Sequence, residues 1–240
     1  MRAAVRGTRR RDPRGARSVT IRLAVSGSNL SGDVPFSAAL AGERGVFARS
    51  SPVGERGDLA SLCRSLCAEA GVTAADVEEV LVDVGPGSYT GLRVAVTFVR
   101  FLQAFAGVSV RAVDSLAWLC HSACRGEHSG VVRGLLDARR GRFCTAAYDC
   151  GGEGGRLVVR QASVALPVDD ALASVTAGEI VALSAALAER IGDDLQARGA
   201  ELRVVRRLVA RSLFEPGIPW IAACTDDLEP RYLMASYAES

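Results

Sequence analysis

Glycine and hydroxyl residues crowd one short stretch of the sequence, Gly85 to Gly91, which reads Gly-Pro-Gly-Ser-Tyr-Thr-Gly. An apolar run rich in β-branched residues, 80–84, precedes it and a helical pattern follows, so we expect a sharp strand-to-helix turn. The free backbone N–H groups of such a turn, helped by the helix dipole, can bind a phosphate group. The candidate phosphate or nucleotide loop consists of Gly85, Gly87, Ser88 and Gly91.

The same loop also has a purely structural interpretation. It lacks the lysine that follows the last glycine of a P-loop, and it lacks the Gly-x-Gly-x-x-Gly spacing of a dinucleotide site. By its own chemistry the loop is more typical of a tight connection in which two pieces of backbone pack closely.

The other reactive side chains do not form a recognisable catalytic set. The sequence has no lysine and only two histidines, His121 and His128, and neither stands near a nucleophile and a third group at a suitable spacing. Asp137 and Arg139 could be a catalytic pair, but an aspartate in a predicted turn more often bonds to its own backbone. We therefore expect no catalytic residues and no metal site.

Seven cysteines cannot all pair with one another, because the number is odd. Cys63 and Cys67, like Cys120 and Cys124, are spaced i, i+4 within predicted helices. A metal site built from both pairs is conceivable, but cysteine is so often a core residue that buried free thiols are the better interpretation.

The loop is positioned by a predicted βαβ unit, in which the strand 80–84 and the helix 90–106 lead into a strand at 108–113. Three strands are expected before it, and a helix over 58–70 with an apolar stripe. Beyond the unit we expect a helix at 115–124, a strand, turn and strand over 131–148, strands at 157–165, 179–183 and 202–206, and helices at 169–175 and 185–198.

The run Gly85–Arg93, GPGSYTGLR, resembles the signature block of the TsaB (YeaZ) family without a break. Two shorter stretches, Asp137–Gly141 and Asp227–Leu233, are also similar to patterns of that family. The resemblance implies an α/β, actin-like (ribonuclease H-like, ASKHA) fold, made of two small lobes with mixed sheets flanked by helices.

The resemblance also implies a function. Members of the family are non-catalytic subunits that bind and support the catalytic protein TsaD, which transfers a threonylcarbamoyl group to the adenosine beside the anticodon of tRNA. The ATPase TsaE joins the full complex in bacterial relatives, and tRNA is contacted through the complex. By resemblance, the helices 58–70 and 90–106 pack against the like pair of TsaD, and a homodimer can mimic this bundle. The candidate partner-binding residues are Leu62, Leu66, Leu92, Arg93, Val96, Val99 and Arg100.

Three other functions are weighed against this one. An actin-like ATP-binding phosphotransferase or hydrolase is disfavoured because Ser26 stands where the first strand of such proteins usually ends in aspartate. A metallopeptidase-like protein is disfavoured because the helix 58–70 lacks the two histidines, spaced i, i+4, that hold the metal in TsaD proteins. A purely structural homodimer is the third. We expect no cofactor, with a nucleotide at the subunit junction left open.

Composition limits the class of protein. The chain has 240 residues, 49% hydrophobic and 23% charged, and no apolar run approaches the roughly 18–20 residues of a membrane span. We expect a soluble, cytoplasmic protein. Its predicted parts are a disordered basic tail, 1–18, an N-terminal lobe, 19–114, a second lobe, 115–225, and a C-terminal extended segment, 226–240.

The positive net charge belongs to the tail. Residues 1–18 hold seven arginines and one aspartate, so the remaining chain has 22 of the 29 basic residues and 26 of the 27 acidic ones, a net charge of −4. This net negative charge argues against RNA binding by the folded part of the chain alone. We interpret the tail as a solvated extension or as the product of an upstream start codon. The alternatives are a basic arm that touches tRNA and a transit peptide.

Overall fold

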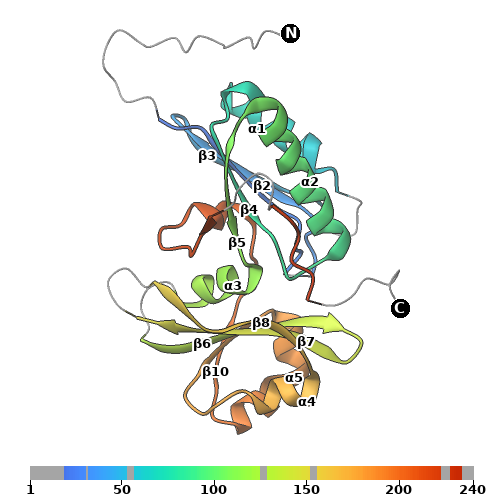
Figure 1. Ribbon diagram of the computed structural model, residues 1–240, viewed down its shortest axis with the longest axis vertical. Coiled ribbons are helices and arrows are strands. Elements are labelled where there is room, and N and C mark those ends of the chain that lie inside the picture. Colours follow the sequence, from blue (N-terminus) through green and yellow to red (C-terminus); the bar gives the residue numbers. More distant parts are fainter. Residues whose placement is uncertain are drawn as a thin grey trace.

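Two lobes, each built on one β-sheet, make up the part of the chain that the computed structural model describes (Figure 1). The described residues are 19–30, 32–52, 57–124, 129–151, 156–222 and 228–233. The predicted tail 1–18, His128 and Cys224 lie outside them, so the predictions for these residues stay open.

The first sheet is centred on the apolar run before the glycine loop. Its strands are β1 (Arg22–Ser26), β2 (Ser37–Gly42), β3 (Gly45–Ser50), β4 (Glu79–Asp83), β5 (Ser109–Val113) and β11 (Ile221–Ala222). They are arranged in the order β11-β5-β4-β1-β2-β3. Strands β1, β4 and β5 run parallel, as the predicted βαβ unit requires, while β2, β3 and β11 pair antiparallel with their neighbours.

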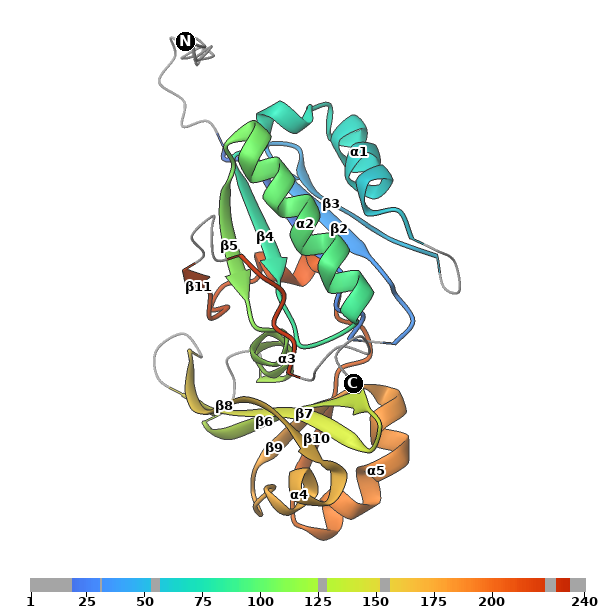
Figure 2. The same ribbon diagram turned by 45° about the vertical axis from the view of Figure 1, so that its right-hand side comes forward.

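Helices α1 (Leu59–Ala70) and α2 (Tyr89–Ala106) cover one face of this sheet, and Figures 1 and 2 show them side by side. A short 3-10 turn, η1 (Ala74–Asp76), follows α1. Local chemistry sets the ends of both helices. The side chains of Asp58 and Ser88 accept hydrogen bonds from backbone N–H groups of the first turns, and each helix ends at a glycine with positive φ. These boundaries are close to the predicted ones.

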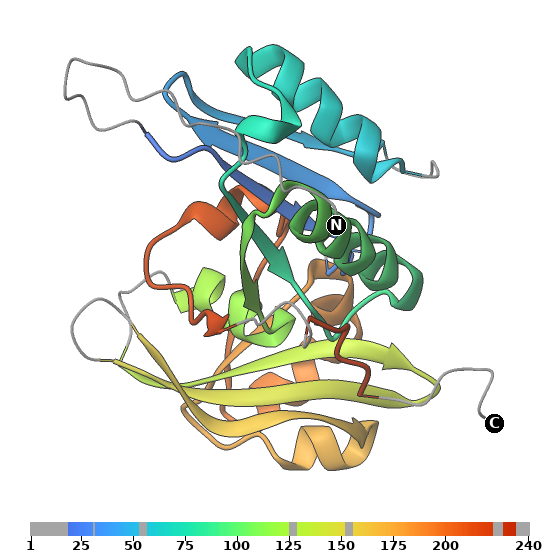
Figure 3. The same ribbon diagram turned by 45° about the horizontal axis from the view of Figure 1, so that its top comes forward.

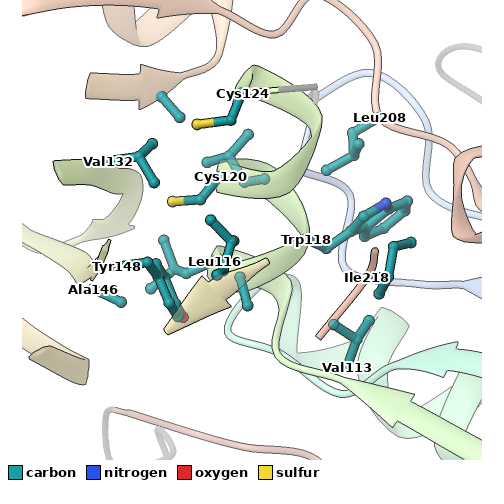
Figure 4. Packing of buried hydrophobic residues seen from close by; sticks show 14 of the residues in the cluster. Val113, Leu116, Trp118, Cys120, Cys124, Val132, Ala146, Tyr148, Leu208 and Ile218 are labelled. Atoms are coloured by element: carbon teal, nitrogen blue, oxygen red, sulfur yellow. The ribbon is translucent and has the colours of Figure 1, made fainter. Parts of the chain in front are cut away.

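Helix α3 (Ser115–Cys124) lies between the two sheets and packs on both lobes (Figure 4). The Asp114 carboxylate caps it by accepting from the N–H groups of Leu116 and Ala117. In Figure 4 the cysteines of α3 face Val132 and Tyr148 of the second lobe, whereas Trp118 points the other way, toward Leu208 and Ile218. The helix is therefore buried on nearly every side.

The second sheet has the order β10-β9-β6-β7-β8. Its elements are β6 (Gly130–Arg139), β7 (Arg142–Cys150), β8 (Leu157–Pro167), α4 (Val168–Ala173), β9 (Ile180–Leu183), α5 (Ala185–Ala197) and β10 (Glu201–Val204). Figures 1 and 2 show α4 and α5 on the face of this sheet that points away from the first lobe, and Figure 3 shows the two sheets one above the other. A buried ion pair between Arg133 of β6 and Glu179, 2.8 Å, lies at the β6–β9 side.

The two lobes repeat one topology. The order β3-β2-β1-β4-β5 of the first sheet corresponds to β8-β7-β6-β9-β10 of the second, with a meander followed by two parallel strands in each. The predicted fold class, two small lobes with mixed sheets flanked by helices, is confirmed. Within the part of the chain that is described, no helix combines the length and apolar composition needed to cross a membrane.

The chain returns to the first lobe earlier than predicted. We expected the second lobe to extend over 115–225, but after β10 the chain forms a short 3-10 helix, η2 (Ala210–Phe214), beside β1 and β2, and then β11, which pairs with β5. The N–H of Ala210 donates to Ser37 Oγ at 2.9 Å. Elements this short carry no periodic pattern, so the sequence does not reveal them.

Candidate functional site

The glycine loop packs directly against the turn that follows β1. A Cβ atom added to Gly91 would lie 2.0 Å from the carbonyl oxygen of Gly27, and one added to Gly87 would lie 2.6 Å from that of Ser28. Real Cβ contacts are never this short, and the obstacle is backbone, which cannot rotate away. Glycine is thus required at both positions by close backbone approach, as the structural interpretation of the loop predicts.

Several N–H groups of the loop are already bonded within the protein. That of Gly85 donates to Ser115 Oγ at 3.1 Å, that of Ser88 to the Ser28 carbonyl at 2.8 Å, and that of Gly91 to Ser88 Oγ at 3.3 Å. Three of the four residues predicted to bind phosphate therefore use their N–H groups to fix the turn and start α2. Gly87 and Ser88 nevertheless line a cleft, described below.

A buried carboxyl group lies beneath the loop at the end of β4. Asp83 is fully buried, and its Oδ2 accepts a hydrogen bond from Ser115 Oγ at 2.9 Å. Burial raises its pKa, although hydrogen bonds from Ser28, Ser26 and Ser115 oppose the rise. Asp83 is not among the residues predicted from the sequence, where its signal is a single acid inside a β-branched run.

Asp83→Asn is expected to make the protein at least as stable as the wild type at neutral pH. Because its pKa is raised in the folded state, the folded chain binds this proton more tightly than the unfolded chain, and wild-type stability falls as pH rises above the ordinary value of 3.8. An amide has the same shape and no proton to lose. Thermal unfolding between pH 4 and 8 should show a smaller decline for the variant; a variant that is markedly less stable at pH 7 would contradict this.

A cleft of about 770 Å³ lies between the lobes. The first lobe supplies the residues after β1 and the loop at the start of α2, the second lobe supplies the β6–β7 hairpin, and residues 231–233 of the C-terminal segment lie along it. This segment, dark red in Figures 1 and 2, runs from the first lobe toward the second. The N–H of Arg231 donates to the Val84 carbonyl at 2.7 Å, and the ring of Tyr232 lies 4.5 Å from that of Tyr89.

Asp137 shapes the hairpin turn on the second-lobe side of the cleft. Its Oδ1 accepts the backbone N–H of Arg139 at 2.7 Å, and its Oδ2 pairs with Arg190. Partial burial raises the pKa of Asp137, but the hydrogen bonds and charges of Arg190 and Arg139 together outweigh it, and the net shift is downward. The aspartate thus stabilises a turn, as sequence analysis favoured over a catalytic pair.

Several large apolar side chains of α2 are exposed. Phe101 and Phe105 are 58% and 83% exposed, their rings stack with centroids 5.7 Å apart, and Val94 is 41% exposed. Phe98 is partly buried beside them. These four residues follow one another at spacings of four, three and four, which places them in one stripe along the helix. We call Val94, Phe98, Phe101 and Phe105 the outer stripe.

Comparison with known proteins gives three findings. A family model described as TsaD, tRNA N6-adenosine threonylcarbamoyltransferase, matches residues 56–215, which is 160 of the 240 residues. A Bacillus subtilis (strain 168) protein named tRNA threonylcarbamoyladenosine biosynthesis protein TsaB is 36% identical over 85 residues, 35% of this chain and 36% of that protein. YeaZ from Pseudomonas aeruginosa has a similar structure, with a TM-score of 0.67 and 21% identity over 89% of this chain and 100% of that one. The chain belongs to the TsaB (YeaZ) family.

A second solved structure has a similar fold. It is described as an uncharacterised protein with similarity to peptidase YeaZ from Pseudomonas aeruginosa, and it matches with a TM-score of 0.68 and 21% identity over 90% of this chain and 100% of its own. The chain therefore has the same two-lobed α/β fold as these two solved structures. The sequence match to the curated TsaB protein spans only about a third of that protein's length.

Four residues predicted to bind a partner of this TsaB-family chain do not lie on its surface. Leu66, Leu92, Val96 and Val99 are at most 2% exposed, and all of them except Leu92 belong to the core cluster between the helices and the first sheet. The prediction is wrong for them because spacing alone does not say which face of a helix meets the sheet. Helix α2, which holds three of the four, has two apolar stripes. Leu62 is partly buried, and Arg93 and Arg100 are exposed. The residues of the outer stripe were not predicted from the sequence to bind a partner.

The reactive side chains of the described residues are used in packing. Six cysteines are buried and free, and burial raises the pKa of Cys63 to about 12 and that of Cys144 to about 11. His121 Nε2 contacts the Pro216 carbonyl at 2.9 Å, and burial lowers its pKa. The prediction of buried free thiols is confirmed for these six.

These thiols are expected to resist modification in the folded protein. The thiolate is the reactive form, and both burial and a raised pKa suppress it. Titration with a coloured disulfide reagent at pH 8 should count at most one fast-reacting thiol, and all seven cysteines after unfolding in guanidinium chloride. Two or more fast thiols in the folded chain would contradict the packing.

Proposed function

We propose that this chain is a non-catalytic subunit that binds TsaD and supports its transfer of the threonylcarbamoyl group to the adenosine beside the anticodon of tRNA. The observation that carries the proposal is the outer stripe. A single-chain protein rarely leaves aromatic residues in line on an exposed helix, and such a patch marks a surface for another protein. Membership of the TsaB family supplies the identity of that protein.

The geometry of the outer stripe suits a helix as its partner. Spacings of four and three residues are those of a helical seam, in which side chains of one helix insert between those of the next. The proposed interface is a bundle of α1 and α2 with two helices of TsaD, centred on Phe101 and Phe105, with Arg93 and Arg100 at its rim. A stable interface of this kind buries about 1,200–2,000 Å² in total.

The same stripe would serve a homodimer when TsaD is absent, since two copies can pair their apolar faces around a twofold axis. In the full complex, TsaE and tRNA would be reached through TsaD, in the cytoplasm where tRNA is modified. The non-catalytic role is supported by the use of His121, Asp137 and the buried thiols in folding contacts.

The test is to mix the purified full chain with TsaD of the same organism and to follow the mass of the species by sedimentation velocity. We expect a heterodimer that persists at about 10 µM and replaces any homodimer of the chain. Two proteins that sediment separately at that concentration would contradict the proposal.

A further inference from the structure

One segment of the folded chain carries an excess of arginine. Residues 198–211 hold five arginines and a single acidic residue, Glu201, although the chain from residue 19 onward has 22 basic and 26 acidic residues. Glu201 is already paired with Arg203, at 2.6 Å. The net negative charge of the folded part therefore conceals a local excess of positive charge, which can attract an anionic partner to one place on the surface.

Three arginines of this segment are exposed to solvent. They are Arg206, Arg207 and Arg211, whereas Leu208 and Leu213 in the same stretch are buried. The segment is thus anchored by its apolar side chains and presents its charges at the surface. Nothing in this packing requires a positive charge at the three exposed positions.

Arg22 extends this positive surface from the first sheet. Its guanidinium group lies over the ring of Phe214, 5.3 Å from the centroid. Arg211 precedes Phe214 by three residues in the 3-10 helix η2, and side chains at this spacing are eclipsed in such a helix. Arg211, Phe214 and Arg22 therefore lie next to one another. An arginine held flat on an aromatic ring keeps the N–H groups at its edge free for an anion.

Arg111 forms a second pair of this kind. Its guanidinium group lies over the ring of Trp220, 4.7 Å from the centroid. Leu81 of β4 is in register with Ala24 of β1 on one side and with Arg111 of β5 on the other. Arg111 and Arg22 therefore project from the same face of the sheet, on strands about 10 Å apart with β4 between them.

Five arginines share this surface, and we call them the basic strip. They are Arg22, Arg111, Arg206, Arg207 and Arg211. Among the described residues, none of the five is in an ion pair. Two carboxylates are near, because Glu79 is the neighbour of Arg22 on β4 and Glu215 follows η2. Five positive and two negative groups leave an excess of three positive charges.

The basic strip is held in place before any partner binds, and it lies away from the outer stripe. Trp118 Nε1 donates to Ser212 Oγ at 3.1 Å, and the N–H of Ala210 donates to Ser37 Oγ at 2.9 Å, which fixes η2. Helix η2 packs on the face of the first sheet opposite α1 and α2, where Figures 1 and 3 show it in orange to red. A surface that is fixed beforehand loses little conformational entropy on binding.

We propose that the basic strip binds the sugar-phosphate backbone of RNA. Guanidinium groups bind phosphate oxygens in pairs, and a row of them matches the repeating charge of a nucleic-acid strand. Phosphate contacts of this kind position a protein on a nucleic acid without reading its sequence. The proposal adds a direct contact with RNA to the proposed function, on which it rests only for the identity of that RNA as tRNA.

The experiment measures binding of the full chain, without TsaD, to a fluorescently labelled, unmodified tRNA transcript. Fluorescence anisotropy gives the affinity at several salt concentrations. The test variant combines Arg206→Gln, Arg207→Gln and Arg211→Gln, all at exposed positions of the basic strip.

The matched control combines Arg64→Gln, Arg156→Gln and Arg160→Gln. It removes the same charge at three exposed positions outside the basic strip. The tail 1–18 is present in all three proteins, so its arginines contribute equally. Melting temperatures establish that all three are folded.

We expect the wild type to bind tRNA and the test variant to lose about tenfold or more in affinity at 0.1 M salt. The control should lose less than about threefold, because isolated exposed charges are screened. The slope of the logarithm of affinity against the logarithm of salt concentration should fall by about 2 in the test variant, since each lost phosphate contact contributes roughly 0.7–0.9.

Three results would overturn the proposal. They are no binding of tRNA by the wild type, equal losses in the test and control variants, and displacement of labelled tRNA by polyglutamate as readily as by unlabelled tRNA, which would identify an acidic protein as the partner. Phe101→Glu, which lies in the outer stripe, should leave tRNA binding by the chain unchanged, so failure of this proposal and failure of the TsaD proposal are distinguishable.

Discussion

Phe101→Glu is expected to weaken binding of the chain to TsaD by about 100-fold or more. Phe101 is 58% exposed in the middle of the outer stripe, and its ring stacks on that of Phe105. Truncating a central aromatic anchor of an interface commonly costs 2 kcal/mol or more, about 30-fold, and a carboxylate at that place must also be desolvated. The dissociation constant can be measured by titration calorimetry with purified TsaD.

Val158→Glu is the matched control. Val158 is 56% exposed on β8, on the other lobe, so the same kind of charge enters an apolar surface position away from the proposed interface. Both variants should melt close to the wild-type temperature, because neither side chain belongs to the core. If Phe101→Glu binds TsaD as tightly as the Val158→Glu control, the outer stripe is not the docking surface.

Gly91→Ala is expected to destabilise the protein by about 3 kcal/mol or more, to the point of preventing folding. In the first turn of an ordinary helix this change is favourable, since alanine has the higher helix propensity. Here the added Cβ would lie 2.0 Å from the carbonyl oxygen of Gly27. Relief requires α2 to move away from β1, and overpacking against backbone costs more than the usual 1–3 kcal/mol for a side chain in a core. Urea unfolding gives the free-energy difference.

Gly192→Ala, in helix α5, provides the comparison. Its Cβ would come no closer than 3.4 Å, to the side chain of Leu202, so we expect a gain of about 0.5–1 kcal/mol from helix propensity. The two substitutions are chemically identical and should have opposite signs. A Gly91→Ala protein as stable as Gly192→Ala would show that the loop is not held by close backbone approach.

The parts of the fold governed by local rules can be predicted from the sequence. The βαβ unit around the glycine loop, the cap formed by Ser88 and the helix end at Gly107 all depend on neighbouring residues, and the structure has each of them. The turn role of Asp137 is of the same kind, because its partner, the N–H of Arg139, is two residues away.

The parts of the fold that depend on distant residues cannot be predicted from the sequence. The sequence shows that α2 is apolar on two sides, but only the position of the first sheet decides that Val96 is buried and Phe101 is exposed. Strand β11 has two residues and is recognisable only by its pairing with β5. The cleft between the lobes is assembled from residues near positions 93, 139 and 231, which the fold alone brings together.

The most direct test of whether this chain supports TsaD is the rate at which TsaD modifies tRNA in the presence and absence of the chain. TsaE and the threonylcarbamoyl adenylate are supplied in both cases. We expect modification to need the wild-type chain and Val158→Glu to support it equally well. Phe101→Glu should not support it at concentrations where the wild type saturates TsaD. Full modification by TsaD without the chain, or with Phe101→Glu at the wild-type rate, would contradict it.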